Sequence, residues 1–300
     1  MNKAFLYEML RTESVSGGEI PLQKKVAAYM REQGAEVETD LAGDVISSIN
    51  SASPFRVLLC GHIDEIASCR VTHITDDGYL QVARPAASVW HWLGGKRVTV
   101  AGAEAAHRCY GPAAAQRRGA HRHRADRSLH RLWLHQPGGG PGAGRPGDFV
   151  TYSYAVDELE NDCIAGRGWT TAWAPIPCST LCCGPGRRGA KVGVFAATTT
   201  GEETTMRGAF HAAGRVRPTL AVAVDVIHTS DFSGMPPQRF GRIKLGGGPP
   251  WPRARCAARL STGRWRRPPG GWESPCSMPS PQALWAPMRI SSTRRVRACP

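Results

Sequence analysis

The stretch VLLCGHIDEI, residues 57 to 66, decides the fold class, because an apolar run passes directly into a polar cluster. A continuous apolar run of this kind is typical of a strand buried on both faces of a sheet. AKVGVFAATTTGEE, residues 190 to 203, and TLAVAVDVIH, residues 219 to 228, have the same form, and RGAFHAAGRV between them predicts a short helix. Open α/β sheets place their active sites at the ends of such strands. The sequence therefore predicts an α/β fold with polar side chains gathered at one edge of the sheet.

The segments around the first strand add a helix and a small β unit. Residues 20 to 33, IPLQKKVAAYMREQ, carry apolar side chains at helical spacing before Gly34, which predicts an amphipathic helix. The segments EVETDL and DVISSIN that follow are β-prone. RVTHITDDGYLQVA, residues 70 to 83, predicts a hairpin that turns at Asp77-Gly78, and KRVTVAG adds a further strand. We therefore expect a small β unit inserted after the first strand.

Charge and cysteine are unevenly distributed along the 300 residues. The formal net charge is +14, but the arginines crowd into residues 107 to 145 and 251 to 300. Seven of the ten cysteines lie in these two stretches or in residues 169 to 186, and no two have C-x-x-C spacing, so a disulfide framework is not indicated. Glu8 interrupts the first apolar run before a signal-peptide core can form, and no apolar segment is long enough to span a bilayer. We expect a soluble cytoplasmic protein with no membrane partner.

Polar clusters at the predicted strand ends carry the candidate chemistry. Zinc takes imidazole nitrogen and carboxylate oxygen, and its histidine ligands need an acceptor on the far ring nitrogen. His62 with Asp64 offers a ligand and its brace. Neighbouring glutamates point different ways, so one of Glu202 and Glu203 can hold metal while the other takes a proton from water. Asp225 ends the third run, although taken singly such an acid is often only a helix cap.

These motifs in this order resemble the M42 family of dinuclear metal aminopeptidases. VLLCGHIDEI, TTTGEETTMRGA and LAVAVDV carry the resemblance, together with LQKKVAAYMREQGAEVETDLAGDVI and GRIKLGGGP. It implies a doubly wound mixed sheet with an inserted β-barrel domain, peptide substrates, two divalent ions (zinc or cobalt) and assembly into homo-oligomeric shells. By the family pattern, the metal ligands are His62, Glu203 and Asp225. Asp64 is the supporting catalytic residue and Glu202 the general base. The implied activity is the release of N-terminal residues from peptides by metal-activated water.

Part of the family pattern is missing where residues 166 to 175 read GRGWTTAWAP. The family places a bridging aspartate there, in the pattern L-D-(D/N)-R-x-G. Tryptophan is encoded by TGG and threonine by ACN, so the codons of WTTAWAP, read one base earlier, encode that aspartate and the glycine. LWAPMRI, residues 284 to 290, hides the family's G-T-D-A in the same way, and HRLWLHQPGGG admits a family helix start in the other frame. We therefore interpret three windows as frame-shifted translation: residues 106 to 144, 169 to 186 and 250 to 300.

This interpretation sets the expected domain organisation and the state of the site. Residues 1 to 67 and 151 to 249 form the catalytic domain, residues 68 to 150 the inserted β domain, and residues 250 to 300 a disordered tail. The chain would lack the bridging aspartate, the G-T-D-A stretch and the family's last histidine ligand. Two cations without a bridge repel each other, so we expect poor metal binding and no activity. We also expect the three windows to be irregular, because their sequence was never selected to pack.

Three other hypotheses remain open. HRHRADRSLHR and STGRWRRPPGG, with aromatic residues interleaved, suit a nucleic-acid-binding protein, but neither has a helical or strand period. We therefore expect no nucleic-acid partner. The histidines and cysteines of the windows could form another metal site, but zinc motifs need paired ligands at short intervals. The last hypothesis is a non-catalytic scaffold that keeps the inserted domain for assembly.

Overall fold

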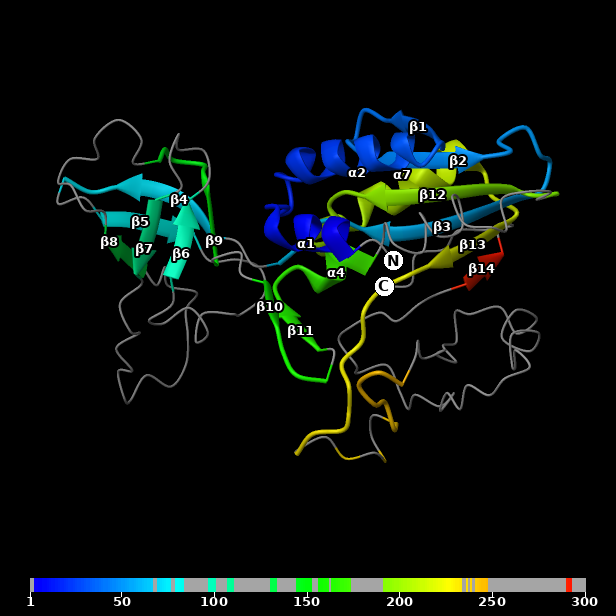
Figure 1. Cartoon of the computed structure of the whole chain (residues 1–300). Helices are drawn as coiled ribbons and strands as arrows, with labels where there is room; N and C mark the ends of the chain where they lie inside the picture. The colour runs from blue at the N-terminus through cyan, green and yellow to red at the C-terminus, as the bar shows by residue number, and fades with distance from the viewer. Residues whose placement is uncertain are drawn as a thin grey trace.

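The computed structural model of the chain consists of an α/β layer and a separate antiparallel β unit (Figure 1). The structure describes residues 3–66, 69–76, 79–83, 97–100, 107–110, 130–133, 144–152, 156–161, 163–173, 191–233, 236, 238, 241–247 and 290–292. Within this part of the chain, no helix is both long and apolar enough to cross a membrane.

The α/β layer is built on a mixed six-stranded sheet. Its strands, in spatial order, are β1 (Glu36–Thr39), β2 (Val45–Ile49), β12 (Gly193–Thr199), β3 (Arg56–His62), β13 (Leu220–Ala223) and β14 (Ile290–Ser292). The central strands β12, β3 and β13 are parallel, and the other neighbours pair antiparallel. The mixed α/β sheet expected from the sequence is thus present.

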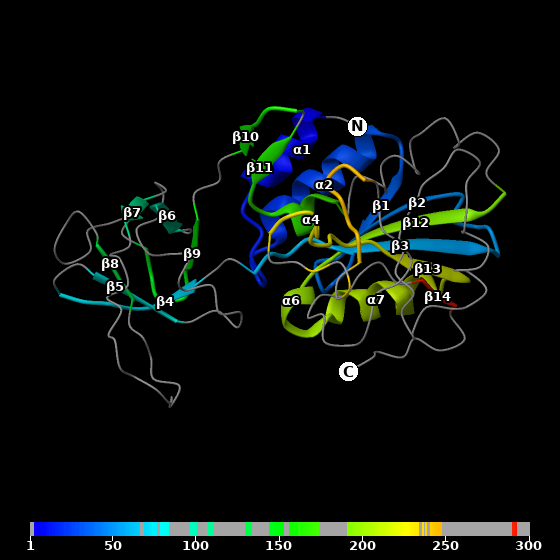
Figure 2. The same cartoon turned by 90° about the horizontal axis from the view of Figure 1, so that it is seen from below.

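Helices cover both faces of this sheet, as Figure 2 shows. The helices are α1 (Lys3–Arg11), α2 (Ile20–Glu32), α4 (Trp169–Trp173), α6 (Glu202–Thr205) and α7 (Arg207–Val216). Leu59 packs in the core cluster formed with α1 and α2, whereas its neighbour Leu58 packs with Ala212 and Val216 of α7 on the other face. Because successive side chains of a strand point to opposite faces, a strand covered on both sides needs an unbroken apolar run. This explains the sequence of β3.

The helix predicted over residues 20 to 33 and the helix RGAFHAAGRV are both confirmed, the first as α2 and the second as α7. Gly34 has a φ of 80°, the left-handed conformation with which helices commonly end. Helix α1 was not expected from the sequence. Its apolar residues recur at helical spacing and are buried, and the ring of Phe5 stacks on that of Tyr29 in α2 with centroids 3.7 Å apart.

The second unit is a six-stranded antiparallel sheet. Its strands, in spatial order, are β7 (His107–Tyr110), β6 (Arg97–Val100), β9 (Phe149–Tyr152), β4 (Cys69–Ile74), β5 (Tyr79–Ala83) and β8 (His130–Trp133). The predicted hairpin is confirmed by the pairing of β4 with β5, although Asp77-Gly78 lies outside the described residues. Val71, Leu80 and Val98 belong to its own small core. The closed barrel implied by the family resemblance stays a prediction. A further hairpin, β10 (Val156–Glu158) with β11 (Ile164–Gly166), lies beside α1 (Figure 1).

The few described residues of the three windows include short regular elements, contrary to the expectation that the windows are irregular. The other residues of the windows lie outside the described part of the chain. Helix α4 lies in the second window, strands β7 and β8 in the first, and β14 in the third. Trp169 of α4 packs against the core cluster of α1 and α2. Strand β14 pairs antiparallel with β13, a contact made through backbone groups that every residue except proline supplies in full. Short elements of this kind therefore need no selected side-chain pattern. The predicted domain boundaries and the frame shifts themselves stay predictions.

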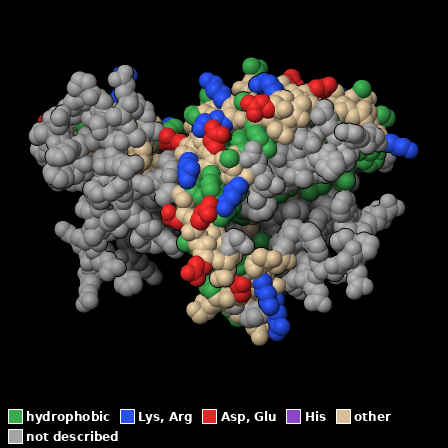
Figure 3. Space-filling model, viewed as in Figure 1, with side chains coloured by type: hydrophobic (Ala, Val, Ile, Leu, Met, Phe, Trp, Pro, Cys, Tyr) green, Lys and Arg blue, Asp and Glu red, His purple; other side chains and the backbone are tan. Residues whose placement is uncertain are grey.

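Side chains of both charges are interspersed over the described surface of the α/β layer on the face that Figure 3 shows.

Candidate active site

The predicted polar clusters meet at the carboxyl edge of the three parallel strands. Thr199 of β12 pairs with His62 at the end of β3, so the loop after β12 brings Glu202 and Glu203 to the same edge. Ala223 of β13 pairs with Cys60, and Asp225 follows two residues later, level with His62. The third run had been expected to form a buried strand up to its acid. Instead β13 ends at Ala223 and its side chains are only half-buried.

His62 is buried, with a side chain 5% exposed. Its Nδ1 lies 2.8 Å from the backbone oxygen of Asp64 and 3.5 Å from Asp64 Oδ1. Since a carbonyl oxygen only accepts, Nδ1 carries a proton, and Nε2 is the ring nitrogen at which a cation can replace the second proton. Nε2 lies 3.7 Å from Asp225 Oδ1. Burial lowers the pKa of His62, but the carboxylates of Asp225 and Asp64 raise it more, to about 11. The site thus stabilises positive charge at this imidazole.

Asp64 fixes the loop that follows β12. It is fully buried, and its Oδ1 accepts a hydrogen bond of 3.0 Å from the backbone N–H of Glu202. Its Oδ2 accepts from the backbone N–H of Glu203, at 3.1 Å, and from Ser16 Oγ, at 2.6 Å. Burial raises the pKa of Asp64, but the hydrogen bonds from His62, Ser16 and Glu202 bring it below its ordinary value. Asp64 is therefore an ionised brace between His62 and the first turn of α6.

Glu202 and Glu203 both face His62. One potential ligand atom of each of the three residues lies within 4.8 Å of the other two. This corrects the expectation that neighbouring glutamates point different ways: the left-handed Gly201, with φ of 65°, starts a single helical turn from which both long side chains reach the same point. Burial raises the pKa of Glu203 to about 7; the charge of His62 opposes this, and the nearby carboxylates of Glu202, Asp64 and Asp225 add to it.

The donor set fits a divalent cation of the zinc class. An imidazole nitrogen and carboxylate oxygens are the ligands that zinc takes in catalytic sites. A carboxyl group whose pKa is raised by burial and by like charges gains most when a cation arrives, because the cation removes both penalties. Glu203 has this character. Of the three predicted ligands, His62 and Glu203 belong to one group of potential ligand atoms, whose third member is the predicted base Glu202. Asp225 lies beside His62 but is not a member of that group.

The position of the expected bridging aspartate holds no carboxylate. Helix α4 contacts β3, and its Thr171 is buried with Oγ1 donating a 2.7 Å hydrogen bond to the backbone oxygen of Gly168. Just before it, Arg167 Nη1 pairs with Glu65 Oε1 at 2.7 Å. Among the described residues of α4, the side chains near the site are therefore tryptophan and threonine, which are no zinc ligands.

Two serines of the site were missed from the sequence. Ser14 Oγ donates a 2.6 Å hydrogen bond to the backbone oxygen of Ile63, and Ser16 donates to Asp64. Both lie between α1 and α2 in the segment ESVSGGE, which has no period. A polar segment rich in small residues between two apolar helices was the available signal, but nothing in it points to residues some 48 positions away.

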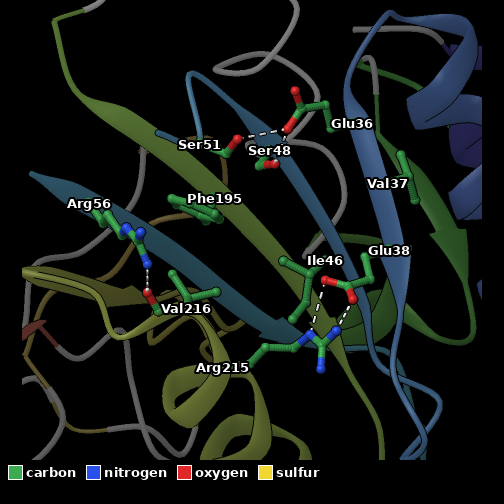
Figure 4. A pocket seen from close by; sticks show the side chains of 10 residues that line it. All are labelled: Glu36, Val37, Glu38, Ile46, Ser48, Ser51, Arg56, Phe195, Arg215 and Val216. Atoms are coloured by element: carbon green, nitrogen blue, oxygen red, sulfur yellow. Dashed lines mark hydrogen bonds and ion pairs between the residues drawn. The ribbon is translucent and has the colours of Figure 1, made fainter. Parts of the chain in front are cut away.

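A pocket of about 360 Å³ lies elsewhere, on the face of the sheet beside the end of α7 (Figure 4). Its charged side chains already have partners within the protein: Arg215 pairs with Glu38, and Arg56 Nη1 donates to the backbone oxygen of Val216 at 2.9 Å. Glu36 Oε2 accepts from Ser51 Oγ at 2.9 Å. The pocket contains none of the predicted site residues, and we do not assign the active site to it.

Comparison with solved structures finds the same fold in aminopeptidases. A TET aminopeptidase from a marine sediment Thaumarchaeota archaeon gives a TM-score of 0.70 at 19% identity, over 83% of this chain and 72% of that chain. The TET1 peptidase of Pyrococcus horikoshii can assemble into a tetrahedron or a large octahedral shell. It gives a TM-score of 0.69 at 19% identity, over 87% of this chain and 79% of that chain. An endoglucanase from Thermotoga maritima gives a TM-score of 0.67 at 17% identity, over 95% of this chain and 86% of that chain. No protein-family model and no curated protein matches the sequence. The predicted resemblance is confirmed as a resemblance of fold.

Proposed function

We propose that this chain is a damaged metal-dependent aminopeptidase of the M42 family, whose intact form releases N-terminal residues from peptides. The observation that supports this most is the group formed by His62, Glu202 and Glu203 at the carboxyl edge of three parallel strands, with Asp225 beside His62. The fold is the one found in TET aminopeptidases, in which an active site at that edge is expected on topological grounds.

Each side chain has a part in the proposed reaction. His62, through Nε2, would hold cations together with Glu203 and Asp225. Two divalent ions, zinc or cobalt by the family resemblance, would polarise the scissile carbonyl group and lower the pKa of water. Glu202 would take a proton from the attacking water and pass it to the leaving amine. Asp64 keeps His62 in the required tautomer and holds the backbone of both glutamates in place.

The damage lies in what the frame-shifted windows omit. Trp169, Thr170 and Thr171 occupy the place of the bridging aspartate. The part of the chain that matches the family pattern does not include the histidine that the family uses as its last metal ligand. Two cations at close range with no bridging anion repel strongly. We therefore expect the active site of this chain to bind at most one divalent ion tightly and the chain to lack activity.

Correction of the reading frames tests both parts of the proposal. Sequencing of the gene over codons 100 to 300 shows whether the frame shifts are real, and a gene corrected over the three windows encodes the corrected chain. With zinc or cobalt, we expect the corrected chain to hydrolyse chromogenic aminoacyl amides and the present chain to be inactive. Glu202→Gln in the corrected chain should abolish turnover but keep metal binding. Peptidase activity of the present chain would refute the proposal that the frame shifts have inactivated it. If the corrected chain is folded and loaded with metal but inactive, the proposed aminopeptidase function is refuted.

Assembly into a homo-oligomer is part of the proposal for the corrected chain. The TET1 peptidase of this fold assembles into shells. Size-exclusion chromatography coupled to light scattering distinguishes a shell from a monomer. A corrected chain that assembles but does not hydrolyse peptides would favour the scaffold hypothesis. A salt-sensitive shift of DNA mobility would instead favour nucleic-acid binding through the basic windows.

A further inference from the structure

A second group of potential metal ligands lies outside the proposed active site. Asp40 and Asp44 belong to the turn between β1 and β2, and His211 lies on α7. One potential ligand atom of each lies within 4.8 Å of the other two. None of the three takes part in the proposed peptidase reaction, and the turn and the helix are far apart in the sequence.

Asp44 is the buried member of this group, with an exposed fraction of 0%. Its Oδ1 accepts hydrogen bonds from the backbone N–H of Thr200, at 2.7 Å, and from Thr200 Oγ1, at 2.9 Å. Its Oδ2 is buried and has no hydrogen-bond partner among the described residues. A buried carboxylate oxygen without a partner is costly, and in native proteins such an oxygen usually has an ion, a water molecule or a proton beside it. This oxygen is the independent sign of a ligand.

The surroundings of Asp44 favour a cation over a hydrogen-bond donor. Burial raises the pKa of Asp44; the hydrogen bonds from Thr200 lower it, the charge of Asp40 raises it, and His211 lowers it. Asp40 itself is held by the backbone, since its Oδ1 accepts from the N–H groups of Ala42, at 2.9 Å, and Asp44, at 3.0 Å. Two fixed carboxylates that repel each other beside an imidazole form a donor set for a divalent ion.

Helix α7 is held against this turn by a glycine. A Cβ at Gly208 would lie 2.6 Å from Asp44 Oδ1 and 2.7 Å from the backbone nitrogen and oxygen of Thr200, so the helix approaches as closely as a glycine allows. His211 follows three residues later and therefore lies on the same face of the helix. Because Asp44 is buried, Asp40 half-buried and His211 exposed, the group opens to solvent on one side, where water can complete the coordination.

We propose that Asp40, Asp44 and His211 form a second site for a divalent cation of the zinc class, which ties the turn between β1 and β2 to α7. The site is structural, since none of its ligands takes part in the proposed peptidase reaction. The proposal does not rest on the aminopeptidase function.

Zinc binding by the untagged full-length chain tests this site. Glu203→Gln and Asp225→Asn together remove two ligands of the proposed active site, and in this background isothermal titration should still show one zinc ion bound. Adding His211→Ala, at an exposed position, should weaken that binding at least about tenfold, because the loss of a ligand costs no less than the loss of a second-sphere partner. His73→Ala, at an exposed position in β4, is the matched control and should change nothing.

A second readout separates coordination from a purely structural effect. Zinc should raise the melting temperature of the background variant and of its His73→Ala form, but not that of its His211→Ala form. Asp44→Asn keeps an oxygen acceptor for Thr200 and should also lose the zinc effect. Zinc binding that survives both His211→Ala and Asp44→Asn, or a background variant that binds no zinc, overturns the proposal.

Discussion

Gly208→Ala and Gly214→Ala place the same methyl group at two positions of α7, and we expect opposite effects on stability. At Gly208 the new Cβ would lie 2.6 Å from Asp44 Oδ1 and 2.7 Å from two backbone atoms of Thr200, closer than carbon atoms approach in folded proteins. Two of these atoms belong to the backbone, so the helix itself must shift. At Gly214 nothing lies within 4 Å of the added Cβ.

The magnitudes follow from two contributions. Alanine stabilises a helix interior by up to about 1 kcal/mol relative to glycine, and part of this gain applies at Gly208 and Gly214, which lie in the first and last turns of α7. Overpacking costs about 1–3 kcal/mol. We therefore expect Gly214→Ala to raise the free energy of unfolding by about 0.5–1 kcal/mol, and Gly208→Ala to lower it by about 1–2 kcal/mol.

Urea unfolding followed by circular dichroism at 222 nm measures both free energies against the unchanged chain. In a thermal scan the two variants should differ in melting temperature by several degrees, with the unchanged chain between them. If Gly208→Ala proves as stabilising as Gly214→Ala, then α7 does not rest on Thr200 as described. The position of the loop that carries Glu202 and Glu203 would then need another explanation than the packing of α7 on Thr200.

Three further changes test the site and its surroundings. Asp64→Ala leaves the half-buried backbone N–H groups of Glu202 and Glu203 without their acceptor, so the free energy of unfolding should fall by about 1–3 kcal/mol, measured by urea titration; an unchanged midpoint contradicts this. Thr170→Asp returns a carboxylate to the bridging position and should tighten zinc binding in isothermal titration, whereas Thr170→Asn, the matched control, should not. Burial raises the pKa of Glu13 to about 7 from an unfolded value of 4.5, so this group costs nothing below pH 4.5, destabilises the fold increasingly as pH rises from 4.5 to 7, and adds no further cost above pH 7. Glu13→Gln should thus gain about 1–3 kcal/mol over the unchanged chain at pH 8 and little at pH 4.5, and an equal difference at both values would refute it.

Local patterns predicted the elements that carry the site. The helix expected over RGAFHAAGRV has the bounds of α7, and the apolar run before His62 is β3. The same rule misjudged the third run, since β13 is half-buried and ends before Asp225. Helix α1 was missed because its sequence was considered only as a possible signal peptide. An apolar run indicates that a segment is at least partly buried, but it does not give the fraction of each side chain that is buried.

The sequence by itself determined which residues stand at the ends of the parallel strands, because strand burial and polar strand ends are properties of neighbouring residues. It therefore predicted that His62, Glu203 and Asp225 lie at one edge of the sheet. Only the tertiary structure decided what surrounds them: Ser16 reaches Asp64 across 48 positions, and Thr200 reaches Asp44 across 156. Such contacts depend on the register of paired strands and on the approach of α7, and both are set by packing of the whole layer. No local period encodes them.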